Sequence, residues 1–411
     1  MTRNSSLLGR SMAQPQTTIA YIPVKPDFLA QAVGVVSVAV SFAYAVGFNT
    51  LVAMRPALSG LVALCVVASL LLGSLLCPRK MTSVLLLLGF MLFMGLSMSW
   101  VGIPQNMDAL TRYCISLAAL FVLIRLPLGD IRRLLSCAAA IILMYASVVA
   151  ITAPGVTVAG VVRAGAFVGG EEGFHSSAIV ISALAIVIWT SPWRWPVKLV
   201  FICTAFALLL AYGGATEMLM LGVFAIFWVA NRRQWPRWLI VALCSLMVLG
   251  SVLYRDENSV EGGTVGQLGA GALGSGRLDA WNERLHIFLN ESFIFQLFGG
   301  GAYSDYRVTP LWWWEEKSAH SDLVTLIMEF GLVGLLFFVI CIIATRRMLS
   351  PVGSMALTAA LAGMVLSNTL LDRPGLAVFW GMAIYSANLA GHGRAQKASG
   401  TVETAALPRA V

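Results

Sequence analysis

Long runs of apolar residues, separated by short polar stretches, dominate the pattern along the chain. A helix that crosses a bilayer needs about 17 to 25 consecutive apolar residues. Windows of this kind centre near residues 37, 67, 92, 118, 143, 183, 204, 222, 246, 334, 361 and 384. The pattern predicts an all-α polytopic integral membrane protein with about twelve transmembrane helices.

The connection between the ninth and tenth windows, residues 255–322, is much longer than the others. It begins with a Gly-rich segment, residues 257–276, which could act as a moving lid. Residues 277–292 follow an amphipathic period. Leu278, Trp281, Leu285, Phe288 and Leu289 share one face, and Asp279, Glu283, Arg284 and Asn290 share the other. This period predicts a helix on the membrane surface, which Gly299, Gly300 and Gly301 end. The aromatic run Trp312, Trp313 and Trp314 suits the headgroup layer.

Composition supports a membrane protein and changes how the net charge is interpreted. Of 411 residues, 59% are hydrophobic and only 11% are charged, with a mean hydropathy of +0.84. The net charge of +8 could indicate a polyanion partner, but most basic residues lie at the ends of the apolar windows. All seven cysteines lie in apolar stretches without a CxxC pair, so we expect neither disulfides nor a metal cluster.

Basic residues concentrate on one side of the predicted helices, which places both termini in the cytoplasm. The expected organisation is a cytoplasmic tail (residues 1–26), transmembrane helices 1–9 (residues 27–254), a large periplasmic loop (residues 255–322), transmembrane helices 10–12 (residues 323–392) and a second cytoplasmic tail (residues 393–411). No nucleic-acid partner is expected.

Two residues of the long loop are candidates for chemistry. Arg277 lies in the first turn of the surface helix, where a cation opposes the helix dipole. It either extends to lipid phosphates or holds a substrate phosphate with its planar guanidinium. His320 precedes the tenth window, where a neutral imidazole could accept a proton, although an ordinary interfacial histidine fits as well.

The segment before the sixth window holds a second group. Arg163 precedes His175 by twelve residues, with Glu171 and Glu172 between them. Arg163 could anchor at the membrane interface or bind phosphate, and the two glutamates could be acid or base groups or a solvated turn. Arg284 and His175 are possible additional site residues.

Other charged residues favour ordinary structural roles. Arg373 is expected to pair with Asp372 or a neighbouring span. Glu217 is either a charge that begins a helix, which is the favoured interpretation, or a group that lines a cavity. No GxxxxGK[ST], HExxH or GxSxG motif occurs, so nucleotide hydrolysis, zinc proteolysis and serine hydrolysis lack support.

The order of these parts over residues 80–390 resembles the O-antigen ligase and polysaccharide polymerase family, including its exopolysaccharide polymerases. The shared parts are RAGAF (residues 163–167), GFHSS (residues 173–177), Gly276-Arg277 followed by Trp281, and AHSDLVTLIMEFGLVGLLFF (residues 319–338). Two positions depart from the family pattern. Ser321 replaces the usual Asn after the histidine, and Gly213-Gly214-Ala215-Thr216 replaces a frequent Ser-Arg.

The resemblance implies a multi-pass enzyme of the bacterial inner membrane that acts on undecaprenyl-diphosphate-linked glycans. Arg163 and Arg277 would bind the diphosphate, and His320 with Arg277 would be catalytic. The resemblance implies no cofactor, no metal and no nucleotide sugar. Besides membrane lipids, the partners could include a flippase and a chain-length regulator.

Three functions stay open. The general likeness to exopolysaccharide members favours polymerisation of lipid-linked repeats. An O-antigen ligase, which transfers the glycan to lipid A core or protein, would use the same parts with a different acceptor. A twelve-helix secondary transporter is the alternative of another class, although no internal repeat is evident and the windows contain almost no charge.

Overall fold

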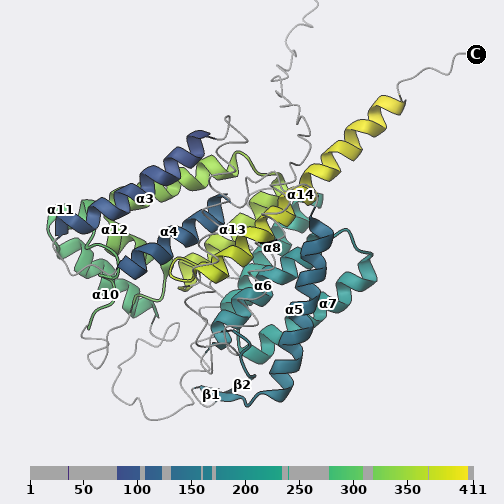
Figure 1. Ribbon diagram of the computed structural model, residues 1–411, viewed down its shortest axis with the longest axis horizontal. Helices are drawn as coiled ribbons and strands as arrows, with labels where there is room; N and C mark the ends of the chain where they lie inside the picture. Colours follow the sequence, from purple (N-terminus) through teal and green to yellow (C-terminus); the bar gives the residue numbers. More distant parts are fainter. Residues whose placement is uncertain are drawn as a thin grey trace, which may run out of the picture.

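The computed structural model describes residues 36, 81–101, 107–122, 131–158, 161–168, 173–233, 239, 277–308, 318–368 and 370–405. These residues form a helical bundle with one small hairpin (Figure 1). The helices are α3 (Met81–Val101), α4 (Met107–Val122), α5 (Arg132–Thr152), α6 (Phe174–Thr190), α7 (Trp195–Tyr212), α8 (Ala215–Arg233), α10 (Arg277–Asn290), α11 (Phe293–Phe298), α12 (Asp322–Arg346), α13 (Pro351–Leu366) and α14 (Pro374–Ala405). Strands β1 (Val156–Val158) and β2 (Val161–Arg163) pair antiparallel, with Val156 opposite Arg163.

The apolar windows and the observed helices correspond closely. Helices α3 to α8 and α12 to α14 cover the windows centred near residues 92, 118, 143, 183, 204, 222, 334, 361 and 384. The windows near 37, 67 and 246 fall almost wholly outside the described residues. Among those described, α5, α7 and α12 are long and apolar enough to cross a membrane, and several shorter helices are apolar. A helical membrane protein is therefore supported, and the count of twelve spans stays a prediction.

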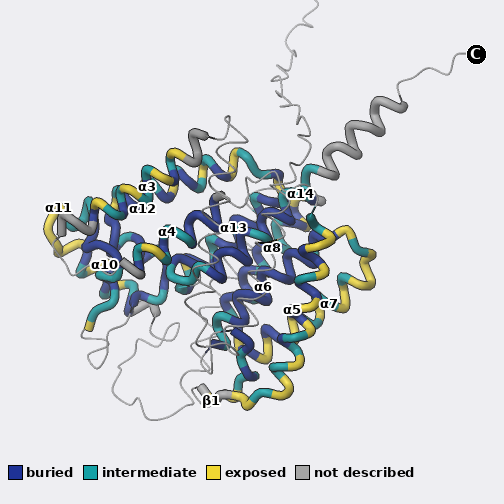
Figure 2. The backbone as a smooth tube through the Cα atoms, viewed as in Figure 1, coloured by how far each residue is buried: buried dark blue, intermediate teal, exposed yellow. Residues whose placement is uncertain are grey.

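Helix α6 forms the centre of the bundle, because it is apolar around its circumference and buried from Ser177 to Ile188. It packs against α5, α7, α8 and α14. Helices α3 and α12 pack together at the other side of the bundle, with α11 against α12. Figure 2 shows buried segments through the middle and exposed ones on α3, α5 and α7. On α7 the exposed residues include Val200 and Leu210, so this surface suits contact with lipid.

The hairpin marks one end of the bundle. We call this end, where α5, α7 and α13 end and α6, α8, α12 and α14 begin, the hairpin end. Local sequence fixes several of these boundaries. Gly213 ends α7 in the left-handed conformation (φ 64°), and the N–H of Gly214 donates to the carbonyl of Leu209. Ser321 caps α12 by accepting a hydrogen bond from the Val324 N–H.

The predicted surface helix exists as α10, but two of its expected features are wrong. It ends at Asn290, and a second helix, α11, begins after its own cap, Ser292, before Gly299. Arg284, expected on the polar face, is fully buried. Its burial is possible because Asp305 is an ion-pair partner inside the protein.

Helix α12 is interrupted at Gly331, and the segment after α11 is hydrogen-bonded to the turn before this interruption. Gly331 has φ 64°, which interrupts the helical hydrogen bonds. The N–H groups of Gly300 and Gly301 donate to the carbonyls of Met328 and Glu329 at 3.0 and 2.8 Å. A β-carbon at Gly331 would lie 2.4 Å from the backbone of Leu297, so glycine is required for this close approach.

Several predicted features lie outside the described residues: the Gly-rich segment 257–276, Trp312 to Trp314, and both glutamates of the sixth-window segment. Helix α14 continues to Ala405, beyond residue 392, where the sequence predicts the beginning of the C-terminal tail.

Candidate functional site

The RAGAF segment, residues 163–167, is held against the hairpin end by its backbone. The N–H of Ala164 donates to the carbonyl of Ala211, and the N–H of Phe167 donates to the hydroxyl of Ser177 at 3.1 Å. Gly165 has no room for a β-carbon, which would lie 2.5 Å from that of Ala153. Phe167 is completely buried. These contacts fix the backbone that follows Arg163, and they therefore restrict where its side chain can lie.

The Arg163 guanidinium lies over the ring of Phe174, the first residue of α6, at 4.2 Å from the ring centroid. This is a cation–π contact. The guanidinium also lies beside Gly213, where a β-carbon would be 3.4 Å from its Cζ. Gly213, having no side chain, thus leaves room for the guanidinium of Arg163.

Next to Phe174, His175 faces the buried carboxylate of Glu217. The distance from Nδ1 of His175 to Oε1 of Glu217 is 3.3 Å. Glu217 lies in the first turn of α8, as the sequence predicts, but it is fully buried. Its carboxylate can fix the orientation of the imidazole, which is about one third exposed.

Two further arginines reach the same end from other helices. Arg373, just before α14, donates from Nη1 to the hydroxyl of Ser176 at 3.1 Å. Its neighbour Asp372 pairs with Arg112 of α4, with 2.9 Å between Oδ1 and Nη1. The expected contact of Arg373 with a neighbouring helix is confirmed. Arg112 was missed by the sequence reasoning, although a charge inside the apolar window of α4 is the signal that could have revealed it.

The segment before α12 holds His320 in an unusual conformation. Its φ is +52°, which is uncommon for a residue with a β-carbon and indicates a constrained backbone. The constraint comes from Ala319, since its carbonyl accepts from Nε1 of Trp281 and its N–H donates to Oδ2 of Asp305, both at 2.8 Å. Ser321 then caps α12, a task that serine and asparagine perform about equally well.

Asp305 is the centre of this second group. Its carboxylate accepts from Nε of Arg284 at 2.9 Å and from the hydroxyl of Thr325 at 2.7 Å, in addition to the Ala319 N–H. The side chains of Arg284 and Asp305 are both inaccessible to solvent. Arg284 therefore joins α10 to the loop and, through Asp305 and Thr325, to α12.

Tyr306 lies between the residues around Arg373 and Asp372 and the segment before α12, since it interacts with Arg373 and Asp372 on one side and with Ser318 on the other. Burial, reinforced by the charge of Asp372, raises the pKa of Tyr306 to about 12, and Arg373 acts electrostatically in the opposite direction. Tyr306 forms a hydrogen bond with Ser318, and its ring stacks on Tyr303 with 4.2 Å between centroids. The phenol of Tyr306 stays protonated at neutral pH, so it remains a hydrogen-bond donor near Arg373.

The structure thus brings Arg163 and His175 together, and it adds Glu217, Arg373 and Arg112. We call these five residues the arginine cluster. Arg277 is the first residue of α10, and only its backbone is described; Glu172 lies outside the described residues. Among the described residues, no three His, Cys, Asp or Glu side chains are grouped as metal ligands would be.

Helix dipoles add to the charge of the cluster. Helices α6 and α8 begin beside Arg163, and α12 and α14 begin at the same end. Each N-terminus carries a partial positive charge, which favours a bound anion. The hairpin end is therefore suited to a phosphate-bearing ligand. Comparison with protein-family models and with curated proteins found no match.

Proposed function

We propose that the chain is a membrane glycosyltransferase that polymerises oligosaccharide repeats carried on undecaprenyl diphosphate. The reaction takes place at the periplasmic face of the bacterial inner membrane, which corresponds to the hairpin end. The observation that carries the proposal is the arginine cluster: Arg163 lies over Phe174, Arg373 donates to Ser176, and His175 pairs with Glu217, so these charged groups surround the N-terminus of α6 within an apolar bundle.

The reaction requires few protein groups. The hydroxyl of the acceptor glycan attacks the anomeric carbon of the donor, the bond from this carbon to the phosphate oxygen breaks, and the diphosphate leaves on its lipid with the electron pair. The enzyme has to neutralise the negative charge that develops on the diphosphate, align the two glycans and accept the hydroxyl proton.

In this scheme Arg163 binds the diphosphate. Its guanidinium is held over the ring of Phe174, which restricts its position. Arg373 and the dipoles of α6 and α8 add positive potential. Arg277, at the start of α10, is a second diphosphate ligand. His320 receives the proton of the acceptor hydroxyl. Its backbone is held in place because the neighbouring Ala319 is hydrogen-bonded to Trp281 and Asp305.

The test uses purified full-length protein in lipid nanodiscs with lipid-linked oligosaccharide repeats. The unmodified protein and Arg347→Ala should produce a ladder of longer lipid-linked glycans, and Arg163→Ala should not. Arg347 is a matched control because it is an exposed arginine at the opposite end of α12. A ladder of unchanged intensity from Arg163→Ala would refute the role of this residue.

A second acceptor separates the two related enzymes. If glycan is transferred to lipid A core and repeats are never joined, the chain is a ligase and the proposed polymerisation is wrong. If neither acceptor is used, glycosyl transfer itself is wrong, and a transport assay becomes the next measurement.

A further inference from the structure

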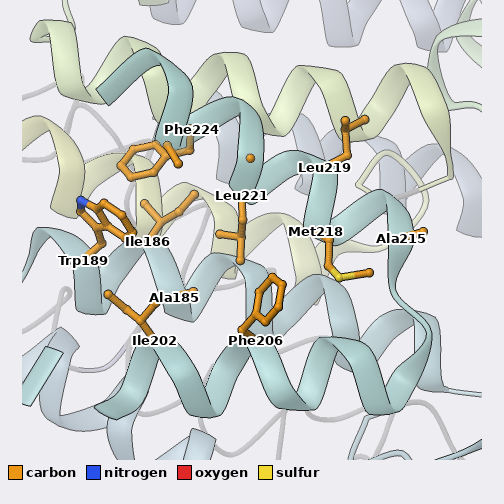
Figure 3. A pocket seen from close by; sticks show the side chains of 12 residues that line it. Ala185, Ile186, Trp189, Ile202, Phe206, Ala215, Met218, Leu219, Leu221 and Phe224 are labelled. Carbon is orange, nitrogen blue, oxygen red and sulfur yellow. The ribbon is translucent and has the colours of Figure 1, made fainter. Parts of the chain in front are cut away.

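A groove lies between α6, α7 and α8, and it encloses a cavity of about 530 Å³. Figure 3 shows Ile202 and Phe206 of α7 facing Met218 and Leu221 of α8 across it, with Ala185 of α6 nearby. The volume is within the range of about 300–1,000 Å³ that is usual for ligand sites.

Only apolar residues line the groove. A sugar or a phosphate would lose its hydrogen bonds to water there without gaining others, which is unfavourable. A hydrocarbon chain has no such requirement. Phe206 is 51% exposed, and its neighbours on the outer face of α7 include Val200 and Leu210, which are also exposed. The groove therefore faces the surface that suits lipid.

One end of the groove meets the arginine cluster. Ala215, which lines this end, follows Gly213 and Gly214, and Gly213 lies against the guanidinium of Arg163. From Ala215 the groove follows α8 to Ala225, a helical rise of about 15 Å. Trp189 lies at the far end in Figure 3. An amphiphile with its charged end at Arg163 would thus place its chain in the groove.

We infer that this groove binds the isoprenoid chain of the lipid diphosphate whose head is bound at Arg163. The inference rests on the proposed function, since the diphosphate at Arg163 defines the direction from which the chain enters. Small residues of α6 and α8, Ala185, Gly222 and Ala225, leave the space that a methyl-branched chain needs.

Photocrosslinking of the full-length protein in nanodiscs tests the inference. The probe is a polyprenyl diphosphate with a diazirine in its chain, and the labelled peptides are identified by mass spectrometry. Labels are expected on α6, α7 and α8, and unlabelled polyprenyl diphosphate should compete. Gly222→Leu fills the groove and should lower labelling about tenfold, the size expected from overpacking.

The matched control is Val229→Phe, a larger side chain at an exposed position of α8 outside the lining residues. This variant should be labelled like the unmodified protein. A phospholipid carrying a diazirine in its acyl chain is the second probe. If it labels the groove equally and polyprenyl diphosphate does not compete, the groove is an ordinary lipid site and the inference is overturned.

The outcomes separate the inference from the proposed function. If Gly222→Leu changes neither labelling nor glycan transfer while Arg163→Ala abolishes transfer, the groove assignment falls and the function stands. If labelling and its loss follow expectation while no acceptor is ever glycosylated, the groove stands and the function falls.

Discussion

Replacing Asp305 with alanine should release the His320 segment from α12. The substitution removes the carboxylate that accepts from Arg284, Thr325 and the Ala319 N–H. It also leaves the guanidinium of Arg284 buried without its counter-charge. Breaking a buried ion pair in this way costs about 3–5 kcal/mol. Since 1.4 kcal/mol changes an equilibrium constant tenfold, the population of the released state should rise at least about a hundredfold.

Hydrogen–deuterium exchange in nanodiscs measures this population. In Asp305→Ala, peptides that cover residues 280–308 and 318–325 should exchange about a hundredfold faster, because local opening exposes their backbone amides. Peptides from α13 should keep the rate of the unmodified protein, because the hydrogen bonds of Asp305 described above connect it to Arg284, Thr325 and Ala319 and not to α13.

Glu283→Ala is the control. Its carboxylate lies 3.9 Å from Nη1 of Arg284 and is partly exposed, so we expect a loss below about 1 kcal/mol. The reasoning is refuted if Asp305→Ala exchanges no faster than Glu283→Ala. It is also refuted if α13 opens together with the loop, because Asp305 would then support the whole bundle and not this segment.

Substitutions at three positions test the site and its supports. Arg163→Lys keeps the charge but loses the guanidinium that lies over Phe174, so polymerisation in nanodiscs should fall about tenfold or more. Full activity would show that charge alone suffices. Gly213→Ala puts a residue with a β-carbon into the left-handed conformation, which costs about 1–2 kcal/mol of stability and should lower the thermal midpoint in detergent. Gly213→Asn should lower the midpoint less, because asparagine adopts this conformation more readily. Equal midpoints in the two variants would contradict the conformational argument. Ser321→Ala should destabilise the protein by about 1 kcal/mol and Ser321→Asn should not, as measured by thermal unfolding; a matching loss in both variants would exclude capping as the cause.

The helices could be predicted from sequence because a helix in lipid satisfies its backbone hydrogen bonds within its own segment. A local apolar window therefore carries most of the required information. The boundaries at Gly213 and Ser321 follow the same logic, since glycine ends helices and serine caps them. The turn between α7 and α8 occurs where the pattern shows Tyr212-Gly213-Gly214.

The site could be predicted only in part, because it depends on contacts between distant segments. Arg163 and His175 were identified as candidates within one segment, but the pairing of His175 with Glu217 of α8 could not be inferred. The amphipathic pattern assigned Arg284 to the outside, since periodicity treats every arginine as solvated. Its partner Asp305 lies 21 residues further along in a loop, where no pattern identifies it.

The break in α12 restricts how a substrate can enter. The carbonyls of Met328 and Glu329 accept hydrogen bonds from the N–H groups of Gly300 and Gly301. If residues 299–308 moved away, these two hydrogen bonds would be lost, at about 0.5–1.5 kcal/mol each, together with the close backbone packing at Gly299 and Gly331. This stretch is therefore a stationary wall of the site, and an acceptor glycan has to approach along a path that leaves it in place.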